Sequence, residues 1–201
     1  MKKILVLATA IFLSTAAFSQ AQFSIGVKAG PNFSKIDTES SVLTNYRSRA
    51  GFHGGAFALL KFAKFGIQPE VLFSQQGSKF TFNSQDLESN YSYVNIPVIV
   101  KLYAVGGLNL QFGPQFGFLA SAQEDKINGL GDVQTSEDVK DEIKKSDFGA
   151  ALGIGWDLPF GLSIDGRYNI GLSDINESSG NERKNQVWQV SLGYKLFKFG
   201  K

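Results

Sequence analysis

The stretch Tyr93-Val94-Asn95-Ile96-Pro97-Val98-Ile99-Val100-Lys101-Leu102-Tyr103 decides the fold of this chain. Every second residue from Val94 to Leu102 is aliphatic, whereas the intervening positions include Asn95, Lys101 and a tyrosine at each end. A period of two is typical of a β-strand, because successive side chains point to opposite faces. The stretch therefore predicts a strand with one apolar and one largely polar face.

The same alternation recurs from Phe23 onward, in segments separated by clusters of Gly, Asn, Asp or Ser. Each segment is about 11 to 15 residues long, against ~5–6 residues for a typical strand of a soluble protein. A tilted strand that crosses a membrane needs ~9–11 residues and a little more at each end. The eight segments are about 23–34, 50–62, 66–80, 91–104, 108–121, 146–157, 161–172 and 186–198.

The connections between these segments alternate in length. The tight turns are 63–65, 105–107 and 158–160, and the long polar connections are about 35–49, 81–90, 122–145 and 173–185. An even number of strands with short turns on one side and long loops on the other is typical of an outer-membrane barrel. The sequence therefore predicts an all-β, eight-stranded antiparallel up-and-down transmembrane β-barrel. Three prolines lie inside the expected strands, where we expect bulges to accommodate the missing N–H donors: Pro69, Pro97 and Pro114.

Residues 1–21 have the pattern of a secretory signal peptide. A basic start at Lys2 and Lys3 precedes an apolar run and small residues, and cleavage after Ser19 or after Ala21 fits this pattern equally well. The expected domains are thus a signal peptide, 1–21, and a barrel, 22–201. Loss of the two lysines leaves 18 basic and 18 acidic residues, so the mature chain lacks the positive charge that a nucleic-acid partner would require.

The composition excludes several other classes of protein. A mean hydropathy of −0.07 excludes a polytopic helical membrane protein. The chain has no cysteine and one histidine, His53, so we expect no disulfide, no zinc–thiolate site, no multi-histidine metal site and no cofactor. His53 could act as a catalytic base, but the spacing specifies no Ser/His/Asp constellation, and a packed histidine is the simpler interpretation.

Periodicity alone does not say which face of the barrel is outside, because a soluble lipocalin-type barrel alternates with its apolar face inward. Strand length and the many Gly and Ser residues on the polar face favour a lipid-facing apolar surface and a narrow polar lumen. The polar face also carries charged residues, which pair more readily inside a barrel than on a regular soluble surface. We therefore expect an ion network that plugs the lumen. The six residues expected in this network are Lys28, Glu70, Lys101, Asp165, Arg167 and Lys195.

Several motifs resemble one family of barrels. The stretches Gly26–Ser34, Gly51–Gly55, Ile67–Gly77, Tyr93–Lys101 and Leu192–Phe197, with Gly113-Pro114, Arg167-Tyr168 and Gly171-Leu172, are similar to the PorT-like outer-membrane β-barrel family of Bacteroidota. The resemblance spans nearly the whole mature chain. It implies a barrel in the outer membrane of a Gram-negative bacterium, and the founding member's role in protein secretion makes secretion one possible function.

Two further features give expectations about the surface. The loop Ala122–Lys145 carries seven acids and four lysines, with a short helix expected from Ser136 onward that places Val139 and Ile143 on one face. It could bind a partner or calcium, although its acids match no EF-hand. Eight aromatic residues are expected in girdles at the two membrane interfaces: Phe62, Phe65, Tyr91, Tyr93, Tyr103, Phe160, Trp188 and Phe197.

The leading hypothesis is a non-enzymatic barrel, in contact with outer-membrane lipid, that acts structurally or binds an envelope or secreted protein through its long loops. The alternatives are small-molecule binding or narrow transport at the barrel mouth, a part in protein secretion and, with least support, an outer-membrane enzyme.

Overall fold

The computed structural model describes residues 21–38, 46–82, 85–127, 133–140, 144–173 and 183–200. The expected signal peptide lies outside these residues except for Ala21, the first residue of the first strand. No helix among the described residues is long and apolar enough to cross a membrane. The strands are β1 (Ala21–Thr38), β2 (Tyr46–Phe62), β3 (Phe65–Phe82), β4 (Gln85–Tyr103), β5 (Leu108–Ile127), β6 (Val133–Asp138), β7 (Ser146–Asp157), β8 (Leu162–Gly171) and β9 (Arg183–Phe199).

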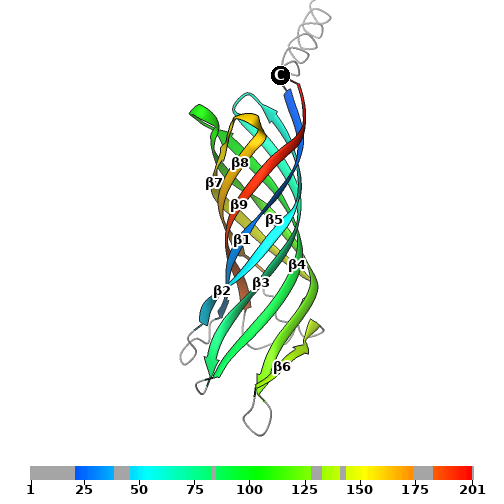
Figure 1. Cartoon of the computed structure of the whole chain (residues 1–201), viewed down its shortest axis with the longest axis vertical. Coiled ribbons are helices and arrows are strands. Elements are labelled where there is room, and N and C mark those ends of the chain that lie inside the picture. The colour runs from blue at the N-terminus through cyan, green and yellow to red at the C-terminus, as the bar shows by residue number, and fades with distance from the viewer. Residues whose placement is uncertain are drawn as a thin grey trace, which may run out of the picture.

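Eight of these strands form a closed wall, which confirms the expected antiparallel barrel (Figure 1). Neighbours in sequence pair around the wall, β9 returns to β1, and the pairing of β4 with β5 completes the circle. β6 is not part of the wall, because it extends the sheet beyond β5 through pairs such as Gln123↔Asp138. Closure leaves no unpaired edge in the wall, as a hydrocarbon surrounding requires.

The two ends of the barrel differ. One end, here called the turn end, carries the tight connections 63–64, 104–107 and 158–161, two of which contain 3-10 turns, Val105–Gly107 and Pro159–Gly161. At the opposite loop end the strands run further than the sequence indicated. The expected long connection 81–90 is wrong, because β3 and β4 pair as far as Phe82↔Gln85. The expected helix from Ser136 is also wrong at its start, because Ser136 lies in β6, whose last two residues, Glu137 and Asp138, pair with β5. Ile143 lies outside the described residues.

The prolines do not produce the expected bulges. Pro69 pairs with Val98 and, three residues on, the β3–β4 ladder continues in the same register. The β4–β5 ladder likewise keeps its register past Pro97, and Pro114 lies in an unbroken β5–β7 ladder. A missing N–H removes a single hydrogen bond, and the flanking pairs hold the strands in place. Register shifts occur elsewhere, for example beside Ile25.

The barrel has its apolar side chains outside and its polar side chains inside. Ile154 and Leu192 are 66% and 60% exposed, and Val98 and Val100 are partly exposed, whereas 21 polar or charged side chains among the described residues are buried. This arrangement is the reverse of a soluble lipocalin-type barrel, whose apolar residues face inward. Three tyrosines expected in the girdles are buried instead, because they are in phase with inward-facing positions: Tyr91, Tyr93 and Tyr103.

Candidate functional site

The lumen holds all six charged residues selected from the sequence. Each lies at an inward position between two outward apolar residues, as Asp165 does between Ile164 and Gly166. The side chains are almost completely buried, except that Lys195 retains 12% exposure. They come from five strands: Lys28 from β1, Glu70 from β3, Lys101 from β4, Asp165 and Arg167 from β8, and Lys195 from β9.

Glu70 and Arg167 form the centre of the network. The guanidinium donates from Nη1 to Glu70 Oε2 at 2.8 Å and from Nη2 to Oε1 at 2.7 Å, and its Nε donates to Gln111 Oε1 at 2.6 Å. Gln68 also donates to Glu70 at 2.6 Å, and Lys28 Nζ lies 3.5 Å from the same carboxylate. This two-pronged geometry is the strongest that an arginine and a carboxylate can make. It ties β3 to β8 across the barrel.

A second group of charges lies toward the turn end. Asp157 accepts from Lys101 at 3.1 Å, from Lys195 at 2.7 Å and from the Tyr103 hydroxyl at 2.9 Å. Asp165 connects the two groups, because it lies 3.7 Å from Lys101 Nζ and 2.9 Å from Lys28 Nζ. Asp157 is not among the six residues expected in the network, although it occupies the polar face at the end of β7, directly after outward-facing Trp156.

His53 lies between a serine and an asparagine. The Asn32 side-chain nitrogen donates to the carbonyl oxygens of Phe52 and Gln75, which leaves Asn32 Oδ1 facing His53 Nδ1 at 2.7 Å. An amide oxygen can only accept, so Nδ1 carries the imidazole proton. His53 Nε2 therefore accepts from the Ser191 hydroxyl, 2.7 Å away. Sequence spacing gave no sign of this arrangement, because its three members come from β2, β1 and β9.

The order hydroxyl, imidazole, amide is that of a nucleophilic triad. Its surroundings oppose catalysis, because Ser191 is only 3% exposed and His53 and Asn32 are fully buried. A substrate carbonyl would have to enter a filled lumen to reach the hydroxyl. We therefore interpret the three residues as a hydrogen-bonded link across the interior, which satisfies polar groups that burial would otherwise penalise.

Buried apolar side chains also form a cluster near the loop end. One member, Val139, follows β6 and donates its backbone N–H to the carbonyl oxygen of Ala122. Near it, a polar cavity of about 10 Å³ is lined by residues that include Asp147 and Asn169. A cavity of this size holds about one water molecule. The apolar cluster consists of Tyr91, Tyr93, Leu119, Ala122 and Val139.

The chemistry available to this site is thus limited. The described residues contain no group of three or more His, Cys, Asp or Glu side chains that could hold a metal ion. The cations of the lumen face carboxylates at hydrogen-bonding distance, which offsets the cost of burying them. The arrangement can hold the strands together and block the interior.

Comparisons with known proteins agree with this architecture. A family model described as outer membrane protein beta-barrel domain matches residues 18–177. The structure is similar to Ail, the attachment invasion locus protein of Yersinia pestis, with a TM-score of 0.51 and 16% identity over 90% of this chain and 99% of that one. It is also similar to Neisserial surface protein A, with a TM-score of 0.52 and 11% identity over 87% and 99%. A comparison with curated proteins found no match.

Proposed function

The chain belongs to the outer membrane protein beta-barrel domain family, and from this premise we propose that it is a non-enzymatic, non-conducting barrel that binds another envelope component at its loop end. The protein is a bacterial outer-membrane β-barrel. Short turns of such barrels face the periplasm and longer connections face outward. The loop end is accordingly the extracellular end.

The filled lumen carries this proposal. An eight-stranded barrel is just wide enough for its own side chains to fill the interior. Here Arg167, Glu70 and Lys28 occupy the middle of the barrel, and Asp157 with its partners occupies the turn end. Passage of a solute would require these ion pairs to separate inside the barrel, at a cost of several kcal/mol for each uncompensated charge. Transport through the lumen is therefore the weaker candidate.

The long strands support an interaction role at the extracellular end. β3, β4 and β5 have 18, 19 and 20 residues, which at ~3.3 Å per residue and a ~40° tilt span about 45–50 Å along the barrel axis. The apolar band of such barrels is only ~25 Å tall. The strands therefore continue well beyond the membrane. Figure 1 shows β3 and β4 extending at the loop end, with β6 attached there.

The loop-end parts of β3, β4 and β5, together with β6, are here called the extracellular sheet, and this sheet is rich in polar residues. The β6 sequence Val133-Gln134-Thr135-Ser136-Glu137-Asp138 contains one apolar residue. A polar groove of about 280 Å³ lies at its base, lined by Arg49, Gln75, Asn90, Tyr91, Ser92, Ser121 and Gln123. A polar sheet with a groove offers main-chain and side-chain hydrogen bonds to a protein partner. We assign the interaction role to this sheet.

A PorT-like assignment is the narrower form of this proposal. The motifs that carry the resemblance supply Lys28, Glu70, Lys101, Arg167 and Lys195 to the lumen. The motifs therefore coincide with the residues that plug the barrel, which supports kinship in fold. A part in protein secretion would then depend on the extracellular sheet and not on the lumen.

Two experiments test the proposal. Folded protein in a planar lipid bilayer should give no current steps, and stable steps from the wild-type chain would contradict a plugged barrel. A photo-reactive amino acid at Gln134 in β6 should give a discrete adduct in intact cells, whereas the same substitution at Val105, which is exposed in a periplasmic turn, should not. Equal adducts at both positions, or none at Gln134, would remove the interaction role from the extracellular sheet.

A further inference from the structure

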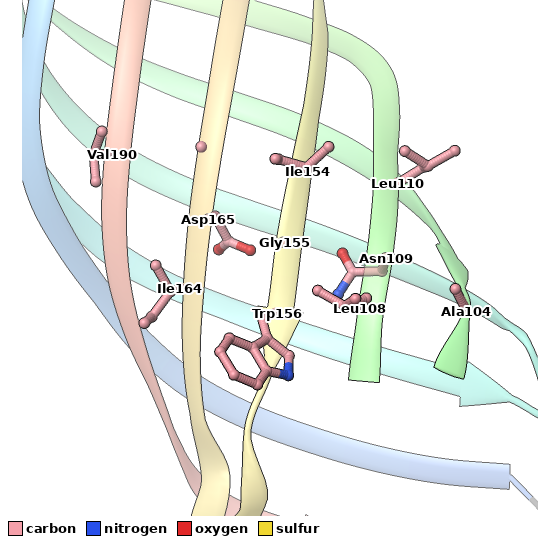
Figure 2. Close-up of a pocket in the computed structure, with 11 residues that line it drawn as sticks. Ala104, Leu108, Asn109, Leu110, Ile154, Gly155, Trp156, Ile164, Asp165 and Val190 are labelled. Atoms are coloured by element: carbon pink, nitrogen blue, oxygen red, sulfur yellow. The ribbon is translucent and has the colours of Figure 1, made fainter. Parts of the chain in front are cut away.

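The lipid-facing surface contains a notch at Gly166. This residue is outward-facing on β8, directly between Ile154 of β7 and Val190 of β9 in the cross-strand register. A Cβ built on Gly166 would have no heavy atom within 4 Å. The flanking Ile154, Ile164 and Val190 are 66%, 44% and 49% exposed. Their side chains project from the wall around Gly166, which has no side chain, and this leaves a depression in the surface. Figure 2 shows these side chains around the pocket.

The notch belongs to a long apolar groove on β5, β7, β8 and β9. One part, of about 550 Å³, runs from Gly166 to Trp156 and Leu108 near the turn end. A second part, of about 480 Å³, also contains Gly166 and continues toward Leu152 and Trp188. A continuous apolar depression of this size on a surface bathed in hydrocarbon matches a flexible hydrocarbon chain in shape and polarity.

The periplasmic end of this groove has a fixed geometry. The Trp156 indole N–H donates to the carbonyl oxygen of Gly106, at 2.9 Å, in the neighbouring turn. This bond holds the ring at the end of the groove, at the depth where interfacial tryptophans lie. The Lys64 carbonyl accepts from the Tyr103 N–H, which places Lys64 beside the turn that begins with Ala104, a groove residue.

A second lysine lies on the other side of the groove. The end of the Lys198 side chain approaches Gly161, in the turn that connects the groove strands β7 and β8. Both Lys64 and Lys198 are exposed. The tight connections 63–64, 104–107 and 158–161 contain no acid, and Asp157, which directly precedes the last of them, is paired with cations inside the lumen. The rim of the groove is therefore positively charged.

We propose that this groove binds an anionic phospholipid of the periplasmic leaflet, with an acyl chain across Gly166 and the phosphate between Lys64 and Lys198. Each lysine near a membrane surface contributes up to about a fivefold preference for an anionic headgroup. A second copy of the chain fits this groove less well. Two copies in one membrane have the same orientation, so a symmetric contact would bring their basic rims together and the like charges would repel.

Tryptophan quenching by brominated lipid tests the proposal. The chain has two tryptophans, so Trp188→Phe leaves Trp156 as the only indole, at the end of the groove. In vesicles of phosphatidylcholine with a minor fraction of brominated lipid, brominated phosphatidylglycerol should quench Trp156 several-fold more effectively than brominated phosphatidylcholine. Equal quenching by the two lipids would overturn the proposal.

Two sets of variants separate the headgroup from the acyl chain. Lys64→Gln with Lys198→Gln should abolish the preference for phosphatidylglycerol and leave quenching by phosphatidylcholine unchanged. Gly166→Leu should reduce quenching by both lipids, whereas Ala58→Leu, on the outer face of β2 away from the groove, should not. Unchanged quenching in Gly166→Leu, with loss of a dimer in micelles, would instead identify the groove as a contact between copies and overturn the lipid assignment.

Discussion

Replacing Glu70 by glutamine tests the centre of the ion network. The carboxylate accepts hydrogen bonds from both terminal nitrogens of Arg167 and from Gln68, and Lys28 Nζ lies 3.5 Å away. A glutamine has one acceptor oxygen and no charge, so the buried guanidinium would lose its paired anion while Asp165 remains 4.0 Å away. Removing one partner of a buried pair costs about 3–5 kcal/mol. We expect E70Q to lose about 3 kcal/mol of unfolding free energy.

The assay is reversible urea unfolding in phospholipid vesicles, followed by tryptophan fluorescence and by the mobility of unheated samples on gels. Asp138→Asn, on the exposed end of β6, is the matched control and should leave the unfolding midpoint unchanged. In E70Q combined with Arg167→Gln the two costs should not add, because the second substitution removes the unpaired charge. Additive costs, or an E70Q midpoint equal to that of the control, would refute the reasoning.

Three further predictions follow from the lumen. Gly155→Ala should lose about 1–3 kcal/mol of unfolding free energy, because its Cβ would meet the Asp165 carboxylate and neighbouring amides in a filled interior, whereas Gly166→Ala should be neutral in the same titration. Tyr103→Phe should lose about 1.5 kcal/mol, because its hydroxyl donates to a buried carboxylate, and an unchanged midpoint would exclude that bond. A fluorophosphonate probe should not label Ser191 in folded protein, and labelling that Ser191→Ala abolishes would show an accessible, activated hydroxyl.

The architecture could be predicted from the sequence because one physical signal dominates it. Alternation with period two, sustained over segments longer than soluble strands require, is needed for a wall with lipid on one side and a polar lumen on the other. The same alternation placed Glu70, Lys101 and Arg167 on the inner face. It could not give their pairing, because Glu70 and Arg167 lie 97 residues apart.

The expectations that are wrong rest on the local preferences of single residues, whereas the structure at these positions is set by the pairing of strands in the closed wall. Proline was expected to bulge its strand, but ladders on both sides of Pro69 and Pro97 keep the register. Residue type alone predicts these tyrosines in the girdles, but the phase of Tyr93 and Tyr103 along their strand places both side chains inside the barrel. The link of His53 to Ser191 spans 138 residues, and it depends on strand order and register that no local pattern contains.

The central claim is that apolar side chains cover the outside of a closed wall and polar side chains fill it. Single cysteines at Val190, Ser191 and Leu192 test it directly, since the natural chain has none. After spin labelling in vesicles, collision with oxygen dissolved in the lipid should be high at Val190 and Leu192 and low at Ser191, which is 3% exposed. High oxygen accessibility at Ser191 with protection at its two neighbours would contradict the claim.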